Sequence, residues 1–356
     1  MPYTEAMLPC RPVIDRAIAF YLFEKAIGRP LKIRFVSQNV HLSNDDIERL
    51  SGQGIFTIGV GSGLKYTDRG FGSETSAILH ELRSVGKIPG HDPVLDDLAR
   101  MMDINNDHHS RRGGYLRRQP YAITWIMRQA YRLGHDADEA DFAFTDEDVV
   151  HRGVHVAAVY IEASRRNERL GLGLREQIIA SPAMQLLPEG GPNKGPRNHQ
   201  GPMTVSRYVR DMFLCCVSED KMLERTGWFV RVHDRAQARQ TTAKEMAKSQ
   251  SFETFPIDDR DEVGTWVDSD DPYLLEELAK SCPLVVMRRS TGNVIIMSKD
   301  FNLSSVADMF LREEPEQWYY QSKPQLLANG TENVDADSSG LSRDTIQDDI
   351  GFLLSF

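Results

Sequence analysis

Two acidic and two histidine side chains fall close together in the stretch DINNDHHSRRGGYLRR. They are Asp103, Asp107, His108 and His109. Divalent manganese, zinc and iron accept a mixed shell of carboxylate and imidazole ligands, so these residues are candidates for a metal site. Because adjacent histidines project in different directions, a polar connection between two helices is the alternative interpretation.

The same stretch carries four arginines, which are Arg111, Arg112, Arg117 and Arg118. Guanidinium groups match phosphate oxygens in a bidentate way, and the two glycines between the arginine pairs let the backbone approach a ligand closely. This pattern predicts recognition of a phosphate group. A solvated basic loop that pairs with the surplus carboxylates of the chain is the alternative.

Asp15 and the turn GVGSGLKYTDRGFGSET are further candidates for ion binding. Asp15 falls in the first turn of a predicted helix, where a carboxylate interacts favourably with the helix dipole, and a metal ligand at a sheet edge is its alternative role. The turn leads into a predicted helix N-terminus at Ser73, and its glycines free backbone N–H groups to cradle an anion. It lacks the G-K-[ST] ending of a Walker loop, and a tight turn without a ligand is the other interpretation.

Alternating strands and helices must position these residues. Hydrophobic periodicity and capping residues predict strands over 31–36 and 55–60 and helices over 12–27, 73–85, 93–103, 121–133 and 148–170. The apolar run at 55–60 is typical of a strand covered on both faces in a parallel sheet. The fold class is therefore α/β, with an N-terminal domain over 1–187 that has a mostly parallel sheet and a helical extension.

The second half predicts a smaller domain. Residues 188–202 are dense in glycine and proline and predict an exposed loop or linker. We expect a C-terminal α+β domain over 203–330, with a strand at 228–232 and a hairpin in which LVVMRR and VIIM flank STGN. A polar, acidic tail over 331–356 ends in apolar residues that can dock.

Charge and cysteine content limit the class of protein. The net charge is −10, so the chain does not coat nucleic acid nonspecifically and any phosphate binding needs a local basic patch. The four cysteines form no C-x-x-C pair, and we expect free thiols in a reducing compartment. No apolar run approaches the length of a membrane span and no signal peptide pattern is present, so we expect a cytoplasmic protein.

In this order the segments resemble the DHH phosphoesterase superfamily, which includes RecJ-type exonucleases, and within it the melanocyte-proliferating-gene-type nucleases. Asp15 ahead of AIAFYLFEKAIG matches the first aspartate of the family pattern, and Asp103 in MMDINND matches a late one. In IFTIGVGSG, Gly59 stands where the family has an aspartate, and YTDRGFGSETSA offers Asp68 alone. On this register the literal triplet 107–109 lies too late in the chain to be the family motif.

The C-terminal stretch CPLVVMRRSTGNVIIMSKDFNLSSVADMF resembles the DHH-associated substrate domain, in which an arginine or serine contacts substrate phosphate. The counterparts in this chain are Arg288, Arg289 and Ser290. The glycine-rich signature that follows in the family is replaced here by LREEPEQWYYQSKPQLLANGT.

The resemblance implies a metal-dependent phosphodiesterase or nuclease-like protein that acts on nucleic acid or nucleotide phosphoesters with Mn2+ or Mg2+. Because the ligand set is incomplete, the alternative is a catalytically degenerate DHH-like protein that binds nucleic acid or nucleotides or serves as a scaffold. A homodimer is one option for its oligomeric state. The implied roles are metal ligation by Asp15, Asp68, Asp103 and Asp107, catalytic assistance by His108 and His109, and phosphate binding by Arg111, Arg112, Arg288, Arg289 and Ser290.

Overall fold

The structure is a computed structural model that divides into two compact units, Met1–Asp234 and Arg235–Phe356. The boundary between the units falls within helix α11 (Glu219–Ser249). The loop or linker expected at 188–202 lies outside the described residues. No helix in the described part of the chain is long and apolar enough to span a bilayer. The residues described are 3–36, 40, 42–60, 71–106, 121–134, 145–166, 172–187, 203–257, 263–314, 317–322, 325–330 and 337–354.

A three-stranded parallel sheet forms the centre of the N-terminal unit, in the order β2-β1-β3. Its strands are β1 (Glu5–Pro9), β2 (Lys32–Val36) and β3 (Ile55–Thr57). The middle strand is β1, which the sequence interpretation missed because its apolar stretch AMLP is too short to show a period. All three strands end at the same edge of the sheet, where parallel α/β sheets place their binding sites.

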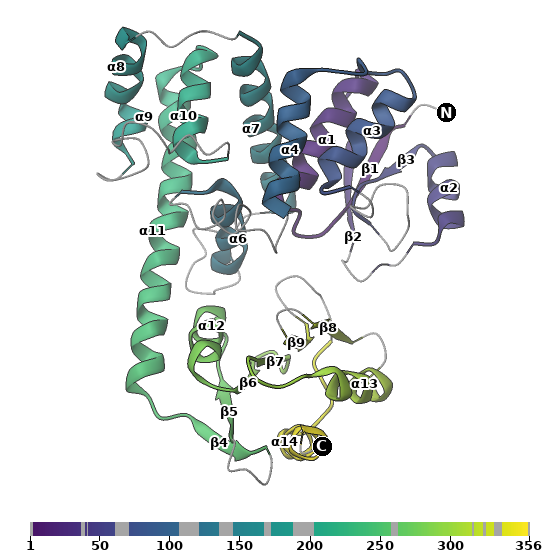
Figure 1. The fold of residues 1–356 in the computed structure, drawn as a ribbon, viewed down its shortest axis with the longest axis vertical. Coiled ribbons are helices and arrows are strands. Elements are labelled where there is room, and N and C mark those ends of the chain that lie inside the picture. Colours follow the sequence, from purple (N-terminus) through teal and green to yellow (C-terminus); the bar gives the residue numbers. More distant parts are fainter. Residues whose placement is uncertain are drawn as a thin grey trace. The chain divides into compact units, whose positions relative to one another are not determined.

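Helices pack against this sheet, and further helices of the N-terminal unit lie beside them (Figure 1). Leu50 packs against Met7 and Val60, so α2 lies on one face, while α1, α3 and α4 pack against one another in sequence order. A short antiparallel bridge between Ala122 and Thr204 joins the segments that precede α6 and α10. The helices are α1 (Ile14–Ile27), α2 (Asn44–Gly52), α3 (Glu74–Ser84), α4 (Pro93–Asn106), α6 (Ile123–Gly134), α7 (Asp146–Arg166), α8 (Leu172–Ala180), α9 (Pro182–Gln185) and α10 (Val205–Leu214).

The strand predicted at 228–232 is wrong, because these residues lie inside α11. The run WFVRV is rich in β-branched and aromatic residues, which favours a strand locally. The longer window shows a helical period instead, since Met222, Phe229, Val232 and Ala236 are all buried at spacings of three, four or seven residues. No proline interrupts the helix from Glu219 to Ser249, so the longer pattern prevails.

The C-terminal unit contains a six-stranded mixed sheet in the order β4-β5-β6-β7-β9-β8. Strands β5 and β6 are parallel and are connected by α12, whereas the other neighbouring pairs are antiparallel. The α/β class with a smaller α+β part therefore matches the observed topology. Its elements are β4 (Glu253–Pro256), β5 (Val263–Asp268), α12 (Pro272–Ser281), β6 (Leu284–Arg288), β7 (Val294–Ser298), α13 (Ser304–Glu313), β8 (Trp318–Ser322), β9 (Gln325–Asn329) and α14 (Arg343–Leu354).

The predicted hairpin is confirmed as β6 and β7, with Gly292 in a left-handed conformation at φ 84° in the turn. The last helix of the chain, α14, also packs onto this unit. In α14, Ile346 and Ile350 are fully buried in the core that packs against this sheet.

Candidate functional site

The candidate site lies where β1 and β3 end, beside the first turn of α1 and the N-terminus of α3. Asp15 is the second residue of α1, and Ser73 is the residue that caps α3. Asp103 comes from the last turn of α4. Two of the residues that the sequence resemblance selected, 88 positions apart by their numbers, thus approach the same helix terminus.

Asp15 binds the N-terminus of α3 through both of its carboxylate oxygens. Oδ1 accepts hydrogen bonds from the Thr75 amide at 3.0 Å and from the Thr75 hydroxyl at 2.5 Å. Oδ2 accepts from the Glu74 amide at 2.8 Å and from the Asn106 side-chain amide at 2.8 Å. A carboxylate offers about four acceptor positions, so these four donors occupy all of them.

The electrostatic setting of Asp15 is unusual because the side chain is buried at 1% exposure. Burial raises the pKa of its carboxyl group, and the hydrogen bonds from Thr75, Glu74 and Asn106 oppose that shift. The carboxylate also lies at the positive ends of two helix dipoles, those of α1 and α3. The N-terminus of α3 therefore does bind an anion, and that anion is a side chain of the protein itself.

Asp103 contacts the same turn of α3 through serine hydroxyls. Its Oδ1 atom accepts hydrogen bonds from Ser73 at 2.5 Å and from Ser76 at 2.7 Å. Gly72 allows this approach, since a Cβ atom at that position would lie 2.7 Å from the Asp103 Cβ and Cγ atoms. Among the described residues Oδ2 of Asp103 has no hydrogen-bond donor, so one carboxylate oxygen is left for a ligand.

Gly59 lies two residues after the end of β3, at the position where the resemblance places an aspartate. Its φ of 64° is left-handed, and a Cβ atom there would come within 2.7 Å of Arg16 Nε and of Glu74 Oε1. The space that a carboxylate would need is thus filled by two other side chains. One of them, Arg16, carries a positive charge into the site.

The described residues by themselves do not fit a metal ion. They contain no group of three or more histidine, cysteine, aspartate or glutamate side chains arranged to hold one. Asp15 has no acceptor position left, and Asp103 offers a single oxygen. The Arg16 guanidinium beside Gly59 has the same sign of charge as a metal ion and would repel it. A two-ion site needs bridging carboxylates that offset the repulsion between the ions.

Six of the residues selected from the sequence lie outside the described part of the chain. They are Asp68, Asp107, His108, His109, Arg111 and Arg112.

The substrate-binding candidates Arg288, Arg289 and Ser290 lie in the C-terminal unit, where β6 ends and turns into β7. The Ser290 amide donates to Asp270 Oδ1 at 3.0 Å, and Arg289 Nε lies 3.7 Å from the same oxygen. Asp270, whose side chain is 53% exposed, is thus the acceptor that Ser290 and Arg289 share at this turn. Arg288 is half-buried and forms no ion pair with another described residue.

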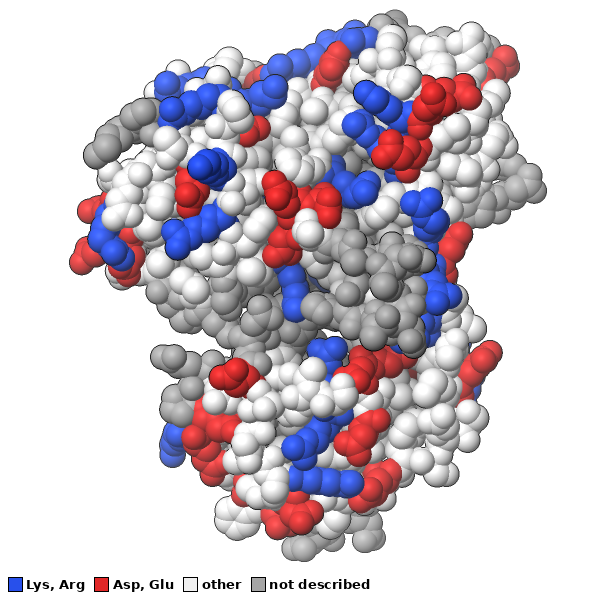
Figure 2. All heavy atoms as spheres, turned by 180° about the vertical axis from the view of Figure 1, so that it is seen from behind, with Lys and Arg blue, Asp and Glu red and all other residues white. Residues whose placement is uncertain are grey.

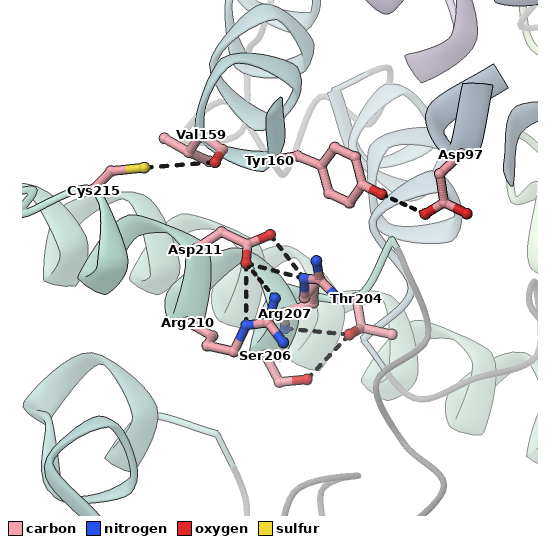
Figure 3. Close-up of polar contacts among 9 residues, drawn as sticks. All are labelled: Asp97, Val159, Tyr160, Thr204, Ser206, Arg207, Arg210, Asp211 and Cys215. Atoms are coloured by element: carbon pink, nitrogen blue, oxygen red, sulfur yellow. Dashed lines mark hydrogen bonds and ion pairs between the residues drawn. The ribbon is translucent and has the colours of Figure 1, made fainter. Parts of the chain in front are cut away.

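A buried ionic group on α10 was not selected from the sequence. Figure 3 shows the Asp211 carboxylate between two guanidinium groups. Arg207 Nε lies 3.0 and 2.9 Å from its two oxygens, and Arg210 Nη2 lies 2.8 Å from Oδ1. The Arg207 guanidinium also lies 5.3 Å from the Tyr160 ring centre, and the Tyr160 hydroxyl donates to Asp97 at 2.7 Å. These contacts connect α4, α7 and α10, and the i,i+4 spacing of Arg207 and Asp211 was the available sequence signal.

Several residues that hold the site together were also not selected. Thr75, Ser76, Arg16 and Asn106 position or surround the two aspartates. Polar residues are common near helix ends, so their types gave no specific signal. Only the packing of α1, α3 and α4 brings them to the carboxylates.

Comparison with solved structures finds likeness to exonuclease RecJ and to CDC45. RecJ from Thermus thermophilus in complex with Mg2+ matches with a TM-score of 0.42 and 12% identity, over 99% of this chain and 49% of that chain. The same protein in complex with Mn2+ gives a TM-score of 0.44 and 11% identity, over 98% and 52%. CDC45 from Entamoeba histolytica gives 0.35 and 8%, over 99% and 95%.

The chain thus spans about half the length of the two Thermus thermophilus RecJ chains. RecJ is one of the protein types that the sequence resemblance named. No protein-family model and no curated protein sequence matches this chain.

Proposed function

We propose that this chain binds a phosphoester of a nucleotide or nucleic acid on a phosphoesterase-like scaffold without hydrolysing it. The observation that carries the proposal is the state of Asp15. All four acceptor positions of its carboxylate are used by Thr75, Glu74 and Asn106. A carboxylate in this state holds α3 in place and has no lone pair to offer a metal ion.

The charges around Gly59 support the same proposal. This position carries no carboxylate, and the space beside it holds the Arg16 guanidinium group together with the Glu74 carboxylate. A guanidinium group is a permanent cation and never acts as a metal ligand. Arg16 can therefore offset the negative charge of the carboxylates in the site, as a metal ion would. Unlike a metal ion, it does not supply an activated water.

Phosphate binding would depend on local arginines rather than on the charge of the whole chain. Figure 2 shows basic and acidic side chains interspersed over the face in view. With a net charge of −10, long-range attraction does not concentrate a polyanion on the molecule. Arg288 and Arg289 at the β6–β7 turn are the described candidates, together with Arg111 and Arg112 outside the described residues.

Metal-dependent phosphodiester hydrolysis is the second candidate function. It is favoured by one observation, that Asp103 Oδ2 is left for a ligand close to the point where Asn106 contacts Asp15. The chain continues from Asn106 directly into Asp107, His108 and His109, which carry the ligand types that the resemblance implies.

Manganese separates the two candidates. We expect the melting temperature to be the same with and without Mn2+, and a generic aryl phosphodiester to stay intact, because a ligand stabilises only the state that binds it. Asp103→Asn is the matched variant, since its Oδ1 can still accept from Ser73 and Ser76. If Mn2+ raises the melting temperature of the wild type but not that of Asp103→Asn, the chain has a metal site. The hydrolase would then be the better proposal.

Oligonucleotide binding is measured by fluorescence anisotropy over a range of salt concentrations. The double variant Arg288→Ala, Arg289→Ala should weaken binding of a single-stranded DNA and flatten its salt dependence by roughly 0.7 in log–log slope for each lost phosphate contact. Lys299→Ala with Arg312→Ala is the control, because it removes two exposed charges from the same unit. Equal effects of the two double variants would show that Arg288 and Arg289 do not bind the phosphates of the DNA specifically.

A further inference from the structure

We propose that Arg152, Tyr208 and Arg225 bind a phosphate group at a second site in the N-terminal unit, separate from the site around Asp15. These residues come from α7, α10 and α11, and His155 and Trp228 complete the group. We call these five residues the α7–α11 cluster. The inference does not depend on whether the site around Asp15 hydrolyses its ligand.

The direction of the hydrogen bonds in the cluster leaves the buried Tyr208 hydroxyl without an acceptor for its proton. Arg225 Nη1 contacts His155 Nε2, and a guanidinium can only donate, so Nε2 is the acceptor. His155 therefore carries its proton on Nδ1, which donates to the Tyr208 hydroxyl oxygen at 2.6 Å. The Tyr208 O–H proton must then point elsewhere, and no described residue accepts it. The residue is only 4% exposed, so this is a buried donor without a partner.

Arg152 provides a second donor of the same kind. Its guanidinium lies over the Trp228 ring, 4.1 Å from the ring centre. Its Nε atom is buried and has no hydrogen-bond partner. In the described part of the chain neither Arg152 nor Arg225 forms an ion pair. The cluster is therefore rich in donors and poor in acceptors.

The charges of the cluster favour an anion. Burial lowers the pKa of Arg152, and the nearby charge of Arg225 adds to the effect. Burial also lowers the pKa of His155 to about 4, with further contributions from Arg225 and Lys221. Asp148 and Glu224 act on Arg152 only through longer-range attraction. His155 is neutral at neutral pH, so the Arg152 and Arg225 guanidinium groups are the charged donors of the cluster.

Phosphate fits this arrangement better than a carboxylate does. The donors come from three helices, whereas a carboxylate offers only two oxygens in a plane. A phosphate group offers three or four oxygens in a tetrahedral arrangement, and guanidinium groups bind it in a bidentate way. Arg152, His155, Arg225 and Trp228 are all partly exposed, so a ligand can reach them.

Calorimetric titration of the full chain with inorganic phosphate near neutral pH tests the site. We expect the wild type to bind phosphate, and Arg225→Gln to weaken binding by about tenfold or more, because it removes a charge-assisted hydrogen bond. Tyr208→Phe should weaken it several-fold while keeping the ring that packs against Phe229. Arg231→Gln is the control, since it removes an exposed arginine from the same helix.

A second arm repeats the titrations with a short single-stranded DNA that has no terminal phosphate. The site is supported if Arg225→Gln, Arg152→Gln and Tyr208→Phe weaken binding of either ligand and Arg231→Gln does not. The ligand whose binding is weakened shows whether the site takes free phosphate or a phosphodiester. Circular dichroism establishes that each variant is folded. The inference is overturned if the wild type binds neither ligand, or if the three variants bind both as well as the control does.

Discussion

The Asn106 side chain donates a hydrogen bond of 2.8 Å to Asp15 Oδ2, although 91 positions separate the two residues. This bond connects the last turn of α4 to the first turn of α1, directly beside the N-terminus of α3. It supplies the fourth donor to a carboxylate that α3 already binds through three. The most buried aspartate of the candidate site is thus held from two helices at once.

Replacement of the Asp15 carboxylate should destabilise the N-terminal unit. Asp15→Asn keeps the shape but turns an NH2 group toward either the Thr75 donors or the Glu74 and Asn106 donors. At least two buried donors then lose their acceptor, and we expect the free energy of unfolding to fall by about 3 kcal/mol. Urea denaturation followed by circular dichroism measures the change.

The control for Asp15→Asn is Asp45→Asn, which changes an exposed aspartate in the first turn of α2. It alters a helix-dipole interaction without exposing a buried donor, so its effect should stay below about 1 kcal/mol. Equal effects of the two variants would show that the hydrogen bonds to Asp15 contribute little.

Gly59 can be tested against a second left-handed glycine. Gly59→Ala and Gly86→Ala both place a Cβ atom at positive φ, 64° and 70°, but nothing lies within 4 Å of the added atom at Gly86. Gly86→Ala should cost about 1 kcal/mol for the backbone alone. Gly59→Ala should cost more, because Arg16 and Glu74 must also move. Equal melting temperatures for the two variants would contradict the crowding at Gly59.

Asp211 is expected to be the most sensitive position of the group in Figure 3. Its side chain is 2% exposed, and it is paired with Arg207 and Arg210 at 17% and 16% exposure. Asp211→Asn leaves two poorly hydrated cations without a counter-charge, and we expect a loss of about 3 kcal/mol of stability. Asp220→Asn, which changes an exposed aspartate on α11, is the control. A loss no larger than that of the control would mean that the arginines reach water instead.

His155 should make the stability of the N-terminal unit depend on pH. Burial, with Arg225 and Lys221, lowers its folded-state pKa from 6.5 to about 4. The unfolded chain therefore takes up a proton below about pH 6.5 while the folded chain does not, so stability falls as the pH drops from 6.5 to about 4. After a discount for partial exposure, we expect His155 to account for roughly 1–2 kcal/mol of this loss.

His155→Gln is the test variant, because glutamine can accept from Arg225 and donate to Tyr208 without titrating. Its denaturation midpoint should vary less between pH 6.5 and 4 than that of the wild type. Parallel pH profiles for the two proteins would assign the slope to other groups.

Much of the architecture could be predicted from the sequence because it depends on local patterns. The helix α1, the start of α4 at Pro93 and the turn between β6 and β7 depend on residues close in the chain, and all three appear in the structure. The strand β1 could not be predicted, since its five residues form a strand only through pairing with β2 and β3. The run 228–232 was misassigned because a local strand propensity was weighed above the period of the longer helix.

The sequence by itself made Asp15, Asp103 and Gly59 the candidate positions, because a resemblance to a family pattern depends on the order of residue types along the chain. Only the tertiary structure decided what those residues can do. The packing of α1, α3 and α4 brings Thr75, Glu74 and Asn106 to Asp15 and fills its acceptor positions, and it brings Arg16 to Gly59. Whether a carboxylate is available to a ligand depends on how many donors already reach it, and that number is set by contacts between residues far apart in the sequence.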